Sequence, residues 1–246
     1  MTGSSDQPPG RWEYVERARA ESARGEVVLR ERRVPDAAHS PDFAGVPAGF
    51  GVLELRVNGV FVMDTLETAT ERELARTALA QVADPRTVLV AGLGLGCTAH
   101  EVLGDARVKR VVVVEIEEAV VGWMRDGTVP HGPSYLADDR LSIVTADIRQ
   151  AVAEASPTTY DLVLLDVDNG PGFLVHAQNA AVYDAPFLHS VATLLRPGGA
   201  VAVWSAAEAP ELADELTMVF AAVTTHPLTV RLQGRDERYW LYVARR

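Results

Sequence analysis

The stretch Thr87-Val-Leu-Val-Ala-Gly-Leu-Gly-Leu-Gly-Cys97 joins an apolar run to a turn with glycine at every second position. Its first five residues predict a strand that is buried on both faces. Gly92, Gly94 and Gly96 would let the backbone approach a ligand closely, and a helix after them would favour negative charge at its N-terminus. A glycine-rich turn between a strand and a helix is the context that nucleotide binding requires.

The same alternation of apolar runs and helical segments continues downstream. We expect strands at residues 110–115, 141–145, 160–165 and 200–204, and helices over 97–103, over a segment that runs through 123, and over 148–155. Continuous Val and Leu runs separated by helices predict a parallel sheet with helices on both faces. Two final strands, at 228–232 and 239–243 with a charged turn at 233–238, complete a Rossmann-like, doubly wound, mostly parallel sheet of seven strands.

The residues before this sheet have a different character. Two alternating apolar runs, 51–57 and 60–63, flank Asn58-Gly59, which is the strongest local signal for a hairpin because both central residues of a type I′ turn need positive φ. We expect a strand at 26–30, a loop at 35–47 and a helix over 70–82. The sequence thus predicts a disordered tail (1–10), a small β-rich antiparallel domain (11–66) and a Rossmann-like domain (67–246).

Composition excludes several classes of protein. The net charge of −11 disfavours nucleic-acid binding, and the basic residues near the start, Arg30 and Arg32 among them, alternate with acidic ones as on a solvated surface. Cys97 is the only cysteine and the histidines lack metal-ligand spacing, so we expect neither disulfides nor a metal site. No signal peptide or membrane span is evident. We expect a cytoplasmic protein that forms a homodimer and has no nucleic-acid or membrane partner.

Acidic residues stand at the carboxyl ends of the predicted strands, where sheets of this kind bind their ligands. Ligands bind beyond the carboxyl ends of the strands, near the point where strand order reverses. Glu115 ends one strand and could accept hydrogen bonds from both ribose hydroxyls, while Asp147 could meet an adenine edge. Asp166 and Asp168 follow a third strand, and two carboxylates there suit the holding or activation of an amine.

Each of these residues also has a purely structural interpretation. Asp168 and Asn169 could form a turn before Gly170-Pro171, and Trp204 could belong to the core. Tyr183 is expected at the surface. Three acids near the start of the 70–82 helix would be solvated or, if they faced the site, would select a cation: Glu67, Glu71 and Glu73.

A nicotinamide dinucleotide is the main competitor as ligand. The dinucleotide fingerprint places a third glycine where this chain has Cys97, and hydride transfer has no evident need for the paired carboxylates Asp166 and Asp168. Both features favour an adenosyl sulfonium donor over a nicotinamide.

Four segments together resemble the class I S-adenosylmethionine-dependent transferases, and within them the spermidine synthase (polyamine aminopropyltransferase) family. They are VLVAGLGLGCTAHEVL (88–103), VVVVEIEEAVV (111–121), YDLVLLDVDNGPG (160–172) and LLRPGGAVAVW (194–204), and the resemblance extends over roughly residues 50–245. It implies that residues 67–246 form the catalytic domain and bind S-adenosylmethionine or its decarboxylated form. The implied donor site comprises Gly92, Gly94, Leu95, Gly96, Glu115, Ile116, Asp147, Ile148 and Asp166.

The resemblance further implies that Asp166, with Asp168, orients or deprotonates an attacking amine. The family's turn carries an Asp that grips the amino group of the aminopropyl donor, and Leu95 stands there in this chain. Val62 and Leu74 replace other family residues. Leu95 favours methyl transfer to a small amine-containing acceptor, the general likeness favours aminopropyl transfer, and a non-catalytic binding or scaffold protein is a third hypothesis that the retained Asp166 disfavours.

Overall fold

The computed structural model describes residues 12–33, 51–232 and 235–246. The tail at 1–10 and the loop at 35–47, both expected from the sequence, lie outside these residues. The chain divides into two compact units, Met1–Leu66 and Glu67–Arg246. No helix among the described residues is long and apolar enough to cross a membrane.

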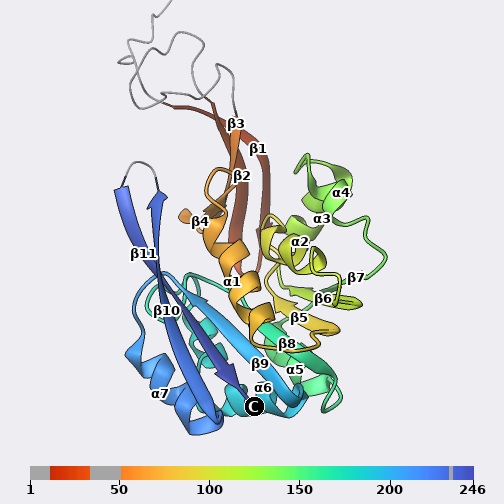
Figure 1. The fold of residues 1–246 in the computed structure, drawn as a ribbon. Helices are drawn as coiled ribbons and strands as arrows, with labels where there is room; N and C mark the ends of the chain where they lie inside the picture. Colours follow the sequence, from red (N-terminus) through yellow and green to blue (C-terminus); the bar gives the residue numbers. More distant parts are fainter. Residues whose placement is uncertain (1–11, 34–50, 233–234) are drawn as a thin grey trace, which may run out of the picture. The chain divides into compact units, whose positions relative to one another are not determined.

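The first unit contains a four-stranded antiparallel sheet in the order β1-β2-β3-β4 (Figure 1). Its strands are β1 (Glu13–Ser22), β2 (Gly25–Arg33), β3 (Gly51–Val57) and β4 (Val60–Asp64). The predicted hairpin between β3 and β4 is confirmed, since Asn58 has φ 51° and Gly59 has φ 76°. The Asn58 side chain also accepts a hydrogen bond from the Glu26 backbone N–H (3.0 Å), which ties this turn to β2.

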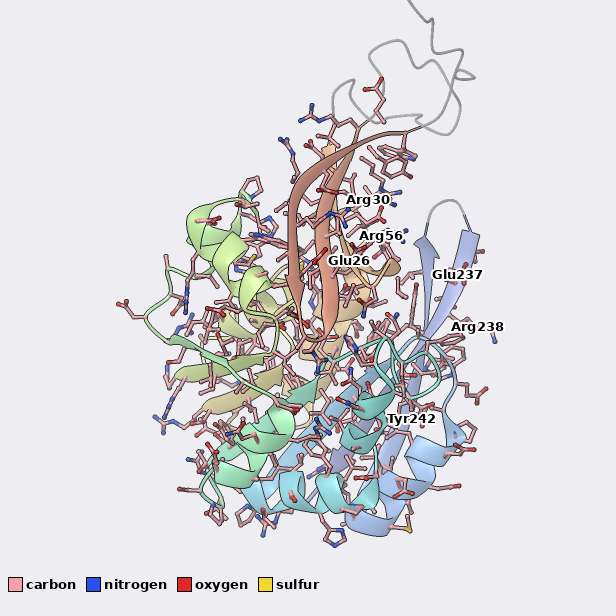
Figure 2. All side chains as sticks on the ribbon, turned by 180° about the vertical axis from the view of Figure 1, so that it is seen from behind. Glu26, Arg30, Arg56, Glu237, Arg238 and Tyr242 are labelled. Carbon is pink, nitrogen blue, oxygen red and sulfur yellow. The ribbon has the colours of Figure 1, made fainter. Side chains whose placement is uncertain are left out.

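Charged residues in the first unit differ in how far they are buried. Strand β1, which the sequence did not predict, is largely exposed, as expected of a solvated face. The expectation that Arg32 lies on a solvated surface is wrong. Arg32 is buried and pairs with the buried Asp64, because β2 lies between β1 and β3 within the sheet. Arg30 and Arg56, labelled in Figure 2, both donate to the Oε1 of Glu54.

The second unit contains the predicted seven-stranded sheet, in the order β10-β11-β9-β8-β5-β6-β7. Its strands are β5 (Thr87–Ala91), β6 (Arg110–Glu115), β7 (Leu141–Thr145), β8 (Tyr160–Leu165), β9 (Leu195–Ser205), β10 (Ala222–Leu232) and β11 (Arg235–Arg245). Strands β5 to β9 pair in parallel, and β11 adds antiparallel pairs with β9 and β10.

Helices cover both faces of this sheet (Figure 1). They are α1 (Ala69–Ala80), α2 (Cys97–Leu103), α3 (Glu118–Asp126), α4 (Gly132–Tyr135), α5 (Ile148–Glu154), α6 (Ala185–Leu194) and α7 (Pro210–Val219), with a short 3₁₀ helix at Ala177–Val182. Helices α1 and α2 pack against each other, and α6 packs against α5 and α7. Alternate strand residues such as Leu89, Val163 and Val201 share one buried cluster with α5, α6 and α7. Tyr242 of β11, labelled in Figure 2, joins this core and accepts a hydrogen bond from the Ala209 N–H at 2.6 Å.

Two expectations about the sheet need correction. Strands β10 and β11 run longer than the apolar runs at 228–232 and 239–243, so residues 235–238 belong to β11 rather than to a turn. They pair in register along the whole hairpin, and backbone pairing extends a strand beyond its apolar residues. Strand β7 is not buried on both faces, because it forms the edge of the sheet and Val144 is exposed.

Candidate functional site

The glycine turn lies where strand order reverses. Strand β5 pairs with β6 on one side and with β8 on the other, and the chain continues outward in both directions. Two backbone hydrogen bonds of 2.9 Å join the three strand ends, from Gly92 N–H to the Val114 carbonyl and from Asp166 N–H to the Ala91 carbonyl. This is the position at which open α/β sheets bind ligands.

Gly92 is required for the close approach of β5 and β8. Its φ is +94°, and a Cβ at this position would lie 2.1 Å from the Asp166 carbonyl oxygen. Gly96 has φ 85° and caps the N-terminus of α2. Leu95, between the glycines, has a fully buried side chain, and its carbonyl oxygen lies 2.8 Å from Nε2 of His131. The conformation of the turn is thus set by its backbone, and the Leu95 side chain places no charged group there.

Glu115 is buried at the end of β6, and both of its carboxylate oxygens contact backbone donors. Oε2 accepts from the Leu93 N–H and Oε1 from the Glu117 N–H, each at 2.8 Å. Burial raises its pKa, while these hydrogen bonds act to lower it. The Gly94 backbone N–H also lowers the pKa of this carboxylate by hydrogen bonding, and acceptance from both ribose hydroxyls stays a prediction.

The other expected donor-site residues have structural contacts. Asp147 caps α5 by accepting from the Arg149 N–H (2.8 Å), and its carboxylate pairs with the Arg149 side chain. Ile148 is buried in the core cluster, whereas Ile116 is half-buried after β6. Adenine recognition by Asp147, and nucleoside contact by Ile116 and Ile148, stay predictions.

Asp166 lies directly after β8, and Thr98 is its partner. The Thr98 hydroxyl of α2 donates to Oδ2 of Asp166 at 2.5 Å. Desolvation by the surrounding protein raises the Asp166 pKa to about 6, against the lowering effect of Thr98. The residue as a whole is half-buried. An enclosed carboxylate with a strongly raised pKa at the end of a strand is a candidate for a reacting group.

Asp168, two residues later, organises its own loop. Its Oδ1 accepts from the backbone N–H of Asn169 (2.9 Å) and of Val175 (2.6 Å), and its Oδ2 accepts from the Asn179 side chain (2.7 Å). Its backbone has φ 59°. These contacts are those of the turn interpretation, and catalysis by Asp168 stays a prediction.

Two side chains near these acids differ from expectation. Tyr183, expected at the surface, is buried, and its hydroxyl donates to the Val167 carbonyl at 2.5 Å. The 3₁₀ segment before it ends in the buried Val182, next to Tyr183, and burial with the nearby Asp168 and Asp166 raises the pKa of Tyr183. Glu71 is only partly exposed: burial, then the charge of Asp166, raise its pKa to about 7.

The remaining candidate site residues have contacts with residues other than Asp166. Trp204 is buried against Tyr239, with ring centroids 5.3 Å apart, and the Ser205 hydroxyl donates to the Ala207 carbonyl at 2.7 Å. Glu73 accepts a hydrogen bond from Thr77, one turn along α1. Among residues 12–33, 51–232 and 235–246, no group of acidic, histidine or cysteine side chains has the geometry to hold a metal.

Comparison with known proteins identifies the family. The model of the spermine/spermidine synthase domain matches residues 67–225, which is well over half of the chain and contains the glycine turn, Glu115 and Asp166. The chain belongs to the spermine/spermidine synthase family. The resemblance inferred from the four sequence segments is therefore confirmed.

Two kinds of curated relative are similar to this chain. Polyamine aminopropyltransferase 2 of Pseudomonas aeruginosa is 33% identical over 168 residues, covering 64% of this chain and 46% of the relative. Putrescine N-methyltransferase 3 of Nicotiana tabacum is 30% identical over 125 residues, covering 50% of this chain and 31% of the relative. The chain thus spans less than half the length of these relatives.

Solved structures of the family share the fold. A spermidine synthase in complex with the transition-state analogue AdoDATO has a TM-score of 0.75 at 16% identity, covering 94% of this chain and 73% of that chain. Spermidine synthase from Thermotoga maritima has a TM-score of 0.73, also at 16% identity, covering 94% and 72%. At this identity the likeness establishes the Rossmann-like fold alone.

Proposed function

We propose that this chain transfers an aminopropyl group from decarboxylated S-adenosylmethionine to an aliphatic amine. The observation that carries the proposal is Asp166, an enclosed carboxylate with a raised pKa beside the glycine turn. The family supports the reaction class, and the aminopropyltransferase relative matches at higher identity and over more of the chain than the N-methyltransferases. This reverses the preference for methyl transfer that Leu95 suggested from the sequence.

The residues of the site fit a nucleoside donor. The turn at Gly92 brings its backbone into contact with the end of β8, and Glu115 places a carboxylate beside this turn as the acceptor for ribose hydroxyls. A sulfonium donor supplies a carbon that is already attached to a good leaving group. Positioning the nucleophile therefore accounts for much of the catalysis that the protein must provide.

Asp166 takes the role of base in this reaction. An aliphatic amine is protonated at neutral pH, so one N–H proton must pass to a base before the nitrogen can attack. Asp166 accepts this proton, and its raised pKa makes it a better base than an ordinary aspartate. The nitrogen lone pair then forms the C–N bond as the C–S bond breaks, and the bonding pair stays on sulfur as a neutral thioether.

Methyl transfer to an amine is the second candidate, and Leu95 is the observation that favours it. Its buried apolar side chain cannot grip an ammonium group on an aminopropyl chain. N-methyltransferases also occur among the relatives that are 30% identical. Both candidates use the same base and differ only in the carbon that the nitrogen attacks.

Product analysis separates the two candidates. The protein would be incubated with S-adenosylmethionine or its decarboxylated form together with a panel of amines, and the released nucleoside would be identified by mass spectrometry. We expect methylthioadenosine from the decarboxylated donor. S-adenosylhomocysteine as the sole product would establish methyl transfer instead, and neither product from either donor would refute both.

A further inference from the structure

Glu71 occupies the first turn of α1, next to the proposed acceptor site. Helix α1 packs against α2, which begins at the glycine turn, and against β8, which ends at Asp166. The Thr70 hydroxyl donates to Oε2 of Glu71 at 2.7 Å, as the Thr98 hydroxyl does to Asp166. Two carboxylates, one from α1 and one from the end of β8, are therefore each held by a threonine and act on each other electrostatically.

The arginine nearest to this pair in the sequence has other partners. Among the described residues, neither Glu71 nor Asp166 forms an ion pair with arginine or lysine at 4.0 Å or less. Arg72, the neighbouring base on α1, instead contacts Glu101 of α2 (3.5 Å) and the Thr68 hydroxyl (3.1 Å). Within the part of the chain that the structure describes, no ion pair therefore balances the two enclosed carboxylates.

Apart from Arg72, whose charge lowers the Cys97 pKa, the described titratable groups that act on Glu71 add no positive charge. Glu67 precedes α1 and contributes further repulsion, and Cys97, at the start of α2, has its pKa raised to about 12 by burial first and then by Glu71. A carboxylate in the first turn of a helix is ordinarily favoured by the helix dipole. Here burial and Asp166 outweigh that effect, so a cationic ligand would relieve an existing repulsion.

We propose that Glu71 is a second acceptor-binding residue, and that the ammonium nitrogen of an aliphatic amine binds between the carboxylates of Glu71 and Asp166. The inference rests on the proposed function and names a residue that sets its acceptor specificity. An ammonium group offers up to three N–H donors, enough for both carboxylates. Binding converts both acids to their charged forms, and any proton that the pair holds in the free protein is released to solvent.

The test compares E71Q with wild type and with E73Q. Glu73 lies two residues away on the same helix and hydrogen-bonds to Thr77 (3.0 Å), so E73Q controls for loss of an acidic residue from α1. Kinetics would give KM for 1,4-diaminobutane and for the sulfonium donor. Calorimetry of 1,4-diaminobutane binding at pH 7, in phosphate and in Tris, would count the protons released.

We expect E71Q to raise KM for the diamine at least tenfold, to leave KM for the donor within twofold, and to abolish most of the proton release. E73Q should match wild type, and E71D should restore part of the affinity. Thermal unfolding should show E71Q to be at least as stable as wild type, because it removes a buried repulsion. Weakened diamine binding could then not be ascribed to misfolding.

The inference is wrong if E71Q binds the diamine as E73Q does with equal proton release, or if it weakens donor binding instead. Calorimetry of the amine needs no turnover. A wild-type protein that released no thionucleoside would therefore refute the proposed function without deciding the role of Glu71, which the binding comparison decides separately.

Discussion

Asp161 and Asp166 lie at opposite ends of β8, and the protein surrounds them differently. At the amino end, Oδ2 of Asp161 accepts from the Thr87 N–H and from the Arg196 guanidinium, both at 2.8 Å. At the carboxyl end, Asp166 accepts a hydrogen bond from the neutral Thr98 hydroxyl, and its pKa is raised to about 6. One acid is paired with a cation, and the other is enclosed without one.

The same difference recurs between the two ends of the sheet. Asp105 and Asp138 precede β6 and β7, and each has its pKa lowered by an arginine two residues later, in the case of Asp138 to about 2. Glu115 ends β6 and Asp166 follows β8, and burial raises the pKa of both. Asp147, which follows β7, is the exception at this end, because it pairs with Arg149. For β6 and β8, arginine pairs stabilise the carboxylates at the amino ends, whereas poorly solvated carboxylates lie at the carboxyl ends, where a ligand can use them.

Removing the base should have the largest effect. We expect Asp166→Asn to lower turnover by roughly 10²–10⁴-fold, the usual contribution of a general base, with donor affinity changed little. Rates of nucleoside release and calorimetric binding of the donor would measure the two quantities. Turnover within a few-fold of wild type would remove Asp166 from the mechanism.

Removing the acid at the other end of β8 should act on stability instead. Asp161→Ala leaves the Thr87 N–H and Arg196 without their carboxylate, and we expect the free energy of unfolding to fall by about 2 kcal/mol. Urea denaturation of this variant and of Asp166→Asn gives the comparison. If Asp166→Asn lost as much stability as Asp161→Ala, the contrast between the two ends would fail.

The raised pKa values predict how stability depends on pH. Asp166 and Glu71 have ordinary values of 3.8 and 4.5 in the unfolded chain, and values of about 6 and about 7 in the folded protein. Between these values the folded protein binds more protons than the unfolded chain, so their contribution makes stability fall as pH rises from about 4 to about 7. In E71Q/D166N, we expect the change in unfolding free energy between pH 5 and 8 to differ from that of wild type by roughly 1 kcal/mol, allowing for solvent screening. If the unfolding free energy depended on pH identically in the two proteins, the raised pKa values of Asp166 and Glu71 would be contradicted.

The smallest effect is expected at an accessible arginine pair. Asp138 and Arg140 lie 2.7 Å apart and keep about a third of their side-chain surface exposed. Asp138→Asn should therefore cost less than about 1 kcal/mol at pH 7. Because the pKa of Asp138 is lowered to about 2, the ion pair's contribution is present above pH 4 and disappears as pH falls through 2. A urea midpoint that shifts as far as that of Asp161→Ala would show that the pair is stronger than its exposure suggests.

Hydrophobic patterning made much of the fold predictable. The bounds of β5, β6, β7 and β8 match the predicted runs, because the central strands of a parallel sheet are buried on both faces and are therefore mostly apolar. Strand β1 was missed, since its alternating charges resemble a solvated segment and it carries no apolar run, although it pairs locally with β2. The lengths of β10 and β11 were likewise set by backbone pairing, which leaves little trace in side-chain composition.

The sequence by itself determined the family, the glycine turn and the acids at the carboxyl ends of β6 and β8, because motif spacing fixes which residues stand at strand ends. Only the tertiary structure decided how those acids are used. It turned Asp168 toward its own loop, buried Tyr183, and brought Glu71 close enough to Asp166 to shift its pKa. The pKa of a carboxylate depends on desolvation and on neighbouring charges, and both arise from elements far apart in the chain.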